Sequence, residues 1–305
     1  MSYDMLVSSV VRASQRGNVH GYLYALNTET KDKRIVLQYD DSSIDFAGRA
    51  AERGLRGICE WDGKYIAASN NKLFIFNQDF EVEKQFEHPY FAHIHEICIQ
   101  GDSLYVTSTG FDLIMALEMP SFTFRKGWYF VKENDAMVMK IAADDSVELE
   151  AKDQFHINNV YVGEDNKVYF GGVGLEHLYC IDTDDILSSS EKLRRGTHNL
   201  QPFGDGIIAN STQENCVRFW NHDGSPKKVV RLPNLSIESD KDTDEKVARA
   251  NFNRGLAISP DQQFIYLGSS PSSVFKVQVE TGEIVDKYEL SDDMRNSVHG
   301  ILLLA

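Results

Sequence analysis

The sequence predicts an all-β fold, a six-bladed β-propeller, from three observations. A pattern of strand, turn, strand, loop and strand recurs along the 305 residues. Each unit begins at a histidine or arginine followed within two residues by an apolar side chain, and successive starts are 39 to 61 residues apart. The chain ends in the apolar strand "GILLLA", which has no partner downstream. Four-stranded units of about 40 to 50 residues are typical of propeller blades.

The units show the same elements in the same order. Their starts lie at Arg56, His95, His156, His198 and Arg254, and His299 opens the last strand of the chain. Turns rich in Gly and Asp join the first two strands, as tight β-connections require: "WDG", "QGD", "GED", "GDG" and "SPDQQ". The expected second strands are "KYIAASN", "SLYVTST", "KVYFGG", "GIIANST" and "FIYLGSS". The expected third strands are "KLFIFN", "DLIMALE", "HLYCID", "CVRFWN" and "VFKVQV".

The two ends of the chain complete one blade between them. The segment "DMLVSSVV" resembles the second strand of the other units, and "GYLYALNTETKDKRIVLQYD" resembles a third and a fourth strand. We therefore expect residues 4–40 to complete the blade that residues 299–305 begin, which closes the ring and removes free sheet edges. Residues 1–305 are then one propeller domain.

Two intervals between units are long. Residues 126–155 can form an extended fourth strand or an added hairpin. The strongly charged residues 234–253 are expected to form a loop or short helix on one face, either as a lid or as a solvated insertion without a role.

Composition argues against several classes of partner. The net charge is −15, from 46 acidic and 31 basic residues, whereas nucleic acid or an anionic membrane surface requires a basic face. No apolar run approaches 18 residues, and no signal peptide is evident at the start. The four cysteines form no CxxC pair and are expected to be buried, reduced thiols. These features predict a cytoplasmic protein.

The unit starts predict the functional site. The first strand of each propeller blade lines the central channel, so equivalent positions converge around the axis. We therefore expect one ring, made of Arg56, His95, His156, His198, Arg254 and His299. This ring holds four of the nine histidines and no aliphatic residue, which favours a functional cluster over simple filling of the channel.

Two chemistries fit the ring. In the first, His95, His156, His198 and His299 bind a divalent transition metal such as Fe, Zn, Mn or Cu, with an open position for substrate. In the second, the histidines act directly as general acid and base without a metal. In both, Arg56 and Arg254 clamp an anionic group of a small substrate. Glu96, Asn158 and Asn199 follow the histidines closely and are expected to orient them or to act as acid/base groups.

The repeating units resemble six-bladed propellers of the broad group that contains gluconolactonases, strictosidine synthase-like enzymes and arylsulfate sulfotransferases. Calcium lactonases of that group have Glu, Asn and Asp on the axis, where this chain has His and Arg, so the resemblance implies neither calcium nor lactonase activity. The His-plus-Arg channel looks more like the arylsulfotransferase type, in which a histidine is the nucleophile. It is also similar to the four-histidine iron site of carotenoid cleavage oxygenases, whose propeller has seven blades.

The leading hypothesis from the sequence is an enzyme with a histidine-bound transition metal and a small anionic substrate. Oxygenase, lyase, isomerase and hydrolase chemistry all remain open. The alternatives are metal-free His/Arg acid–base or transfer catalysis, and a non-catalytic propeller that binds a protein on one face.

Overall fold

The computed structural model describes residues 2–44, 53–163, 165–175, 177–182, 186–187, 196–221, 223–234 and 251–304. The chain forms two compact units. Unit 1 consists of Met1–Ile58, Asn210–Arg218 and Val229–Ala305, and unit 2 consists of Cys59–Ala209 and Phe219–Lys228. The expectation of a single domain over residues 1–305 stays a prediction.

Six antiparallel sheets make up the described structure, five with four strands and one with five. The helical elements in the described ranges are two 3₁₀ turns, η2 (Thr109–Phe111) and η3 (Thr212–Glu214). The predicted all-β, six-bladed propeller is confirmed. In the same ranges, no helix is long and apolar enough to cross a membrane.

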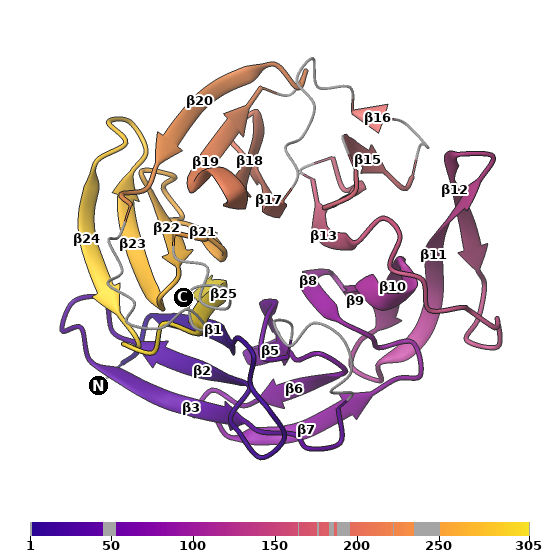
Figure 1. Cartoon of the computed structure of the whole chain (residues 1–305), viewed down its shortest axis with the longest axis horizontal. Helices are drawn as coiled ribbons and strands as arrows, with labels where there is room; N and C mark the ends of the chain where they lie inside the picture. The colour runs from indigo at the N-terminus through magenta and orange to yellow at the C-terminus, as the bar shows by residue number, and fades with distance from the viewer. Residues whose placement is uncertain are drawn as a thin grey trace. The chain divides into compact units, whose positions relative to one another are not determined.

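Unit 1 contains two whole sheets. One has the order β25 (Asn296–Leu303), β1 (Met5–Val11), β2 (Gly21–Leu26) and β3 (Lys33–Tyr39). The other has the order β21 (Leu256–Ile258), β22 (Phe264–Ser269), β23 (Ser273–Gln278) and β24 (Ile284–Glu289). In the first sheet, Met5 lies opposite Leu303, and Figure 1 shows β25 beside β1. The two ends of the chain therefore close one blade, as predicted.

Unit 2 also contains two whole sheets. The five-stranded one has the order β12 (Ala136–Ala142), β11 (Thr123–Glu133), β10 (Leu113–Glu118), β9 (Ser103–Ser108) and β8 (Ile94–Gln100). The four-stranded one has the order β13 (Ile157–Val162), β14 (Val168–Gly172), β15 (Leu178–Cys180) and β16 (Ile186–Leu187). Strands β11 and β12 form the hairpin that was one of the two expectations for the long interval after β10 (Figure 1).

Two sheets have residues in both units. One has the order β4 (Ile58–Trp61), β5 (Lys64–Ala68), β6 (Lys72–Phe76) and β7 (Val82–Glu87). The other has the order β17 (Thr197–Phe203), β18 (Gly206–Ser211), β19 (Cys216–Trp220) and β20 (Pro226–Arg231). Of the charged interval 234–253, residues 235–250 lie outside the described residues, so its expected role as loop, helix or lid stays a prediction.

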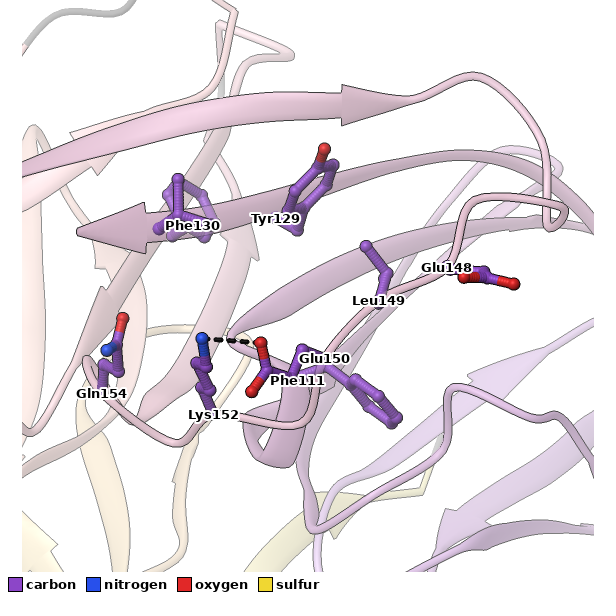
Figure 2. Close-up of a pocket in the computed structure, with 9 residues that line it drawn as sticks. Phe111, Tyr129, Phe130, Glu148, Leu149, Glu150, Lys152 and Gln154 are labelled. Atoms are coloured by element: carbon purple, nitrogen blue, oxygen red, sulfur yellow. Dashed lines mark ion pairs between the residues drawn. The ribbon is translucent and has the colours of Figure 1, made fainter. Parts of the chain in front are cut away.

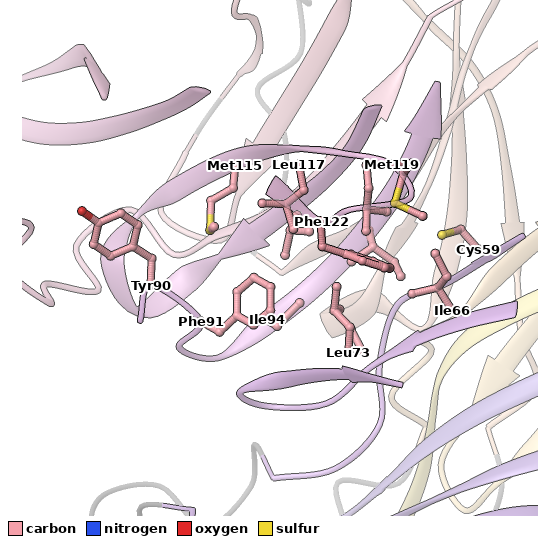
Figure 3. Packing of buried hydrophobic residues seen from close by; sticks show 14 of the residues in the cluster. Cys59, Ile66, Leu73, Tyr90, Phe91, Ile94, Met115, Leu117, Met119 and Phe122 are labelled. Atoms are coloured by element: carbon pink, nitrogen blue, oxygen red, sulfur yellow. The ribbon is translucent and has the colours of Figure 1, made fainter. Parts of the chain in front are cut away.

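An apolar cluster of unit 2 joins residues of β8 and β10, and Figure 3 shows how Ile94, Met115 and Leu117 pack in it. Leu113, Met115 and Leu117 are alternate residues of β10, so they share one face of the sheet, and all three are fully buried. Ile94 and Ile97 of β8 belong to the same cluster. They flank His95 and Glu96, so the core holds the strand on both sides of this polar pair.

Candidate functional site

β-bulges lie at the first strands of three sheets, where the sequence placed the ring. In β8, Ile94 pairs with Ser108 and Ile97 with Val106, so His95 and Glu96 together face Thr107. The Thr107 hydroxyl accepts a hydrogen bond from the Glu96 N–H at 2.9 Å. Bulges are frequent next to active sites because they re-aim side chains.

The other two bulges have the same form. In β13, Ile157 pairs with Gly172 and Asn159 with Gly171, which leaves Asn158 as the extra residue. In β25 of unit 1, the pairs of Val298 and Gly300 with β1 leave His299 as the extra residue.

The register corrects one assignment from the sequence. Asn158, not His156, takes the place in β13 that His95 takes in β8. His156 corresponds instead to His93: both have positive φ, 53° and 56°, and both follow a residue whose carbonyl accepts a hydrogen bond from a glycine N–H. The alignment of the unit starts was therefore displaced by two residues at His156.

Three of the predicted histidines nevertheless lie together in unit 2. The ring centres of His95 and His156 are 4.9 Å apart in an edge-to-face arrangement, and those of His95 and His198 are 6.5 Å apart. His95 and His198 are buried, whereas the His156 side chain keeps 19% of its surface exposed. His156 is thus the imidazole that a small molecule in solution can reach most directly.

The Nδ1 atom of each of these rings has an oxygen partner. Nδ1 of His95 lies 2.9 Å from the His93 carbonyl, and Nδ1 of His198 lies 2.8 Å from the Gly196 carbonyl. A carbonyl can only accept, so these nitrogens donate. In a neutral imidazole that donates from Nδ1, the lone pair is on Nε2. Both rings therefore carry their lone pair on Nε2.

Asp153 and His156 form a carboxylate–imidazole pair. His156 Nδ1 lies 2.9 Å from both carboxylate oxygens of Asp153. A carboxylate at Nδ1 fixes the ring orientation and stabilises the imidazolium that forms when Nε2 takes a proton.

The carboxylate of Asp112 anchors the segment that carries this pair. It accepts the backbone N–H groups of Gln154 at 2.6 Å, Phe155 at 3.0 Å and Ile157 at 3.3 Å. Asp112 is buried and follows η2 in the left-handed conformation, with φ 47°. Desolvation raises the pKa of its carboxyl group, and the hydrogen bonds from the three N–H groups act in the opposite direction.

Glu96 supplies a carboxyl group in an unusual state. Its Oε2 accepts a hydrogen bond of 2.8 Å from Nδ2 of Asn199, which follows His198 in β17. Burial raises the pKa of Glu96 to about 8, and the bond from Asn199 only partly offsets this. At neutral pH the protonated acid therefore predominates. Burial also raises the pKa of the neighbouring Cys59 thiol, and the Glu96 charge adds to that effect.

The remaining ring residues lie in unit 1. Arg254 donates from Nη1 to Nε2 of His299 at 2.7 Å, and its guanidinium lies 4.8 Å from the ring centre of Phe252. Arg56 is fully buried, and its carbonyl accepts the hydroxyl of Ser8. The structure thus joins Arg254 with His299, whereas a single ring of all six residues stays a prediction.

The spacing of the imidazoles bears on the metal hypothesis. A ligand ring whose nitrogen lies ~2.0–2.1 Å from zinc has its centre about 3.2 Å from the metal, so two tetrahedral ligands have centres about 5 Å apart. The pair His95–His156 fits this spacing, but the pair His95–His198 exceeds it. In the part of the chain that the structure describes, no three His, Cys, Asp or Glu side chains are grouped as ligands of one metal ion.

A pocket of about 200 Å³, which was not expected from the sequence, lies beside the segment 148–154 (Figure 2). Its walls include Phe111, Tyr129 and Leu149, together with the ion pair of Lys152 and Glu150 at 2.6 Å. Gln154 also lines it, so residues 148–156 supply both a wall of the pocket and the Asp153–His156 pair. The aromatic run "GWYF" and the later acidic run "ELEAK" were the available sequence signals.

Comparison with known proteins identifies the fold only. No protein-family model matches the chain, and no curated protein matches it significantly. A Bacteroides caccae protein of unknown function is similar in structure, with TM-score 0.61, 11% identity, and coverage of 98% of each chain. A chain of a nidogen/laminin complex has TM-score 0.60, 10% identity, and coverage of 98% of this chain and 97% of that one. A streptogramin B lyase has TM-score 0.49, 16% identity, and coverage of 80% and 71%, and this likeness carries no activity over to the chain.

Proposed function

We propose that the chain is an enzyme that performs acid–base chemistry on a small molecule at the cluster of His95, His156, His198 and Glu96. The observation that supports this most strongly is the Asp153–His156 pair lying edge to face against His95, with a 4.9 Å ring separation. A carboxylate-oriented imidazole that remains partly exposed is the usual arrangement of a general base.

In this proposal His156 transfers the proton. Asp153 holds the proton on Nδ1, so Nε2 accepts a proton from the substrate and Asp153 stabilises the resulting imidazolium. Glu96 is the complementary group, because a carboxylic acid that stays protonated at neutral pH can donate a hydrogen bond or a proton. A proton acceptor and a proton donor acting on one substrate are what acid–base catalysis requires.

Metal-dependent catalysis is the second candidate, and one observation favours it. His95, His156 and His198 each hold Nδ1 against a carbonyl or carboxylate oxygen, which is how proteins orient metal-binding imidazoles. His95 and His156 would then be the first two ligands, and the His198 ring would have to approach by more than 1 Å, on the ~5 Å spacing of tetrahedral ligands. A bound metal would supply Lewis-acid chemistry. That Arg56 and Arg254 clamp an anionic group stays a prediction from the sequence.

The test is a screen of small carboxylates, sulfate esters and phosphate esters for turnover by untagged protein. We expect His156→Ala to lose activity by about 10²- to 10⁴-fold, the usual contribution of a general acid or base. Asp153→Asn should lose a smaller part. Lys152→Ala, on the same segment but outside the pair, is the matched control and should keep full activity. If wild type and His156→Ala have equal activity on every substrate that is turned over, the proposal is refuted.

Elemental analysis of the same preparations separates the two chemistries. Metal-free protein that keeps its activity in chelator supports direct acid–base catalysis. A stoichiometric transition metal that is lost in both His95→Ala and His156→Ala supports the metal site instead. If neither the metal-free nor the metal-bound protein turns over any substrate, and the chain specifically captures a folded protein on one face, a non-catalytic binding propeller would be favoured.

A further inference from the structure

The orientation of the Asn158 amide is fixed by its neighbours. Asn159 accepts the Leu200 N–H at Oδ1, at 3.3 Å, and donates from Nδ2 to the Thr197 carbonyl at 3.1 Å. The oxygen and nitrogen of Asn159 are therefore assigned by partners that can only donate or only accept. Asn159 Nδ2 also donates to Oδ1 of Asn158 at 2.6 Å. The Asn158 oxygen must face Asn159, and its Nδ2 must point elsewhere.

This Nδ2 is a buried donor without an acceptor. Asn158 is only 1% exposed, and its Nδ2 has no hydrogen-bond partner among the residues that the structure describes. Leaving a buried donor unpaired destabilises the folded state, so such groups are rare unless a ligand or water pairs with them. An apolar residue would avoid this cost in a position that served packing alone.

The position of Asn158 places this donor at the histidine cluster. Strand β13 is adjacent to both β8 and β17, and Asn158 holds the bulge place in β13 that His95 holds in β8. His156 lies two residues earlier in the chain.

We propose that Asn158 is a ligand-binding residue, whose Nδ2 donates to a carboxylate or carbonyl oxygen of the small molecule that the cluster receives. This inference rests on the proposed function for the location of the site, but it specifies the substrate as one that carries an sp² oxygen. Asn158 holds that oxygen while the neighbouring acid and base act on the rest of the molecule. An amide donor in a buried site is a known means of binding such an oxygen, and it strengthens as the oxygen gains charge.

The test is a titration of ¹⁵N-labelled protein with acetate and, separately, with acetamide, at constant ionic strength maintained with sodium chloride. The side-chain NH₂ resonance of Asn158, assigned by its loss in Asn158→Asp, should shift saturably. A response to acetate alone identifies a carboxylate ligand, and a response to both identifies carbonyl oxygens in general. The NH₂ group of Asn210 is buried and already bonded to the Gly255 carbonyl, so its resonance is an internal control that should not move.

Two variants keep the test decisive. Asn158→Asp retains the acceptor for Asn159 but removes the donor, and should abolish the acetate-induced shifts of neighbouring resonances. If that variant does not fold, Asn158→Leu serves the same purpose. His156→Ala should still bind acetate, so a failed catalytic role and a failed binding role are distinguishable. An unmoved Asn158 resonance in the wild type, or equal acetate binding by the variants, would overturn the inference.

Discussion

Replacing Glu96 by glutamine should stabilise the protein, and the gain should grow as the pH rises. The carboxyl group is held beside Asn199, and burial raises its pKa to about 8 from an ordinary value of 4.5. Glu96→Gln preserves the shape and the oxygen that accepts from Asn199, but it removes the ionisation. The substitution therefore isolates the free energy of placing a charge at this position.

The sign and size follow from linkage. Between pH 4.5 and about 8 the folded protein holds a proton on Glu96 that the unfolded chain has released, so the free energy of unfolding decreases as the pH rises through this window. At ~1.36 kcal/mol per pH unit, the full decrease is about 5 kcal/mol. This is an upper bound, because part of the Glu96 side chain remains in contact with solvent, and water weakens the effect. We expect the stability difference between variant and wild type to increase by about 2 kcal/mol from roughly pH 5 to roughly pH 9.

Urea denaturation of both proteins across this pH range measures the difference directly. Other titrating groups contribute equally to both proteins and cancel in the comparison. Glu83→Gln is the matched control, because that glutamate is 39% exposed and pairs with Lys64 on the surface, so its effect should be within about 0.5 kcal/mol at every pH. Parallel curves for Glu96→Gln and wild type, or a variant that is less stable at alkaline pH, would refute the buried neutral acid and with it the role proposed for Glu96.

Two further predictions concern the supports of the first strands. Asp112→Ala leaves three backbone N–H groups without their acceptor and places alanine in a left-handed conformation, so it should lower the free energy of unfolding by about 3–5 kcal/mol. Asp112→Asn should lower it by less than half of that amount. Urea denaturation measures both losses, and equal losses would contradict the anchoring role of the carboxylate. Gly268→Ala would bring a Cβ to 2.2 Å from both the Arg254 carbonyl oxygen and Cγ1 of Val298. Thermal denaturation should therefore show that the free energy of unfolding falls by at least ~3 kcal/mol. An unchanged stability would mean that this strand pairing is wrong.

The fold could be predicted from the sequence because each blade repeats the same pattern of apolar strands and polar turns. Apolar alternation predicted the second and third strands to within a few residues, and the unpaired "GILLLA" predicted its pairing with β1. The hairpin β11–β12 could be recognised only as one of two possibilities, since a long β-pattern does not reveal where it turns back. The turn at Asn134 and Asp135 uses two left-handed residues, a conformation that Asn and Asp tolerate.

The histidine cluster could be predicted only in part from the sequence. The sequence indicated correctly that His95 and His198 start equivalent strands, and the structure brings both near His156. The sequence did not reveal that the Asp112 carboxylate anchors the segment before β13, because hydrogen bonds between residues 42 or more positions apart leave no local pattern. Nor did it reveal the pKa of Glu96, which depends on burial by neighbouring strands.

The displaced alignment at His156 has a physical cause that the sequence does carry. Residues three apart in a regular strand face opposite sides of the sheet. Yet Ile94 and Ile97 share one core cluster, and Ile157 and Val160 share another. A bulge between the members of each pair makes this possible, because two residues then occupy the place of one.

The diagnostic pattern is therefore an apolar residue, two bulge residues and a second apolar residue, rather than a histidine at the start of the strand. Val298 and Ile301 flank His299 in the same way and share a core cluster of unit 1. Applied to "HINNV", the pattern selects Asn158 and Asn159 as the bulge pair and assigns His156 to the loop before it. The core thus imposes the bulge, and the bulge frees two consecutive side chains from packing. In β8 and β13 those positions carry Glu96 and Asn158, the neutral acid and the unpaired donor on which the proposed chemistry depends.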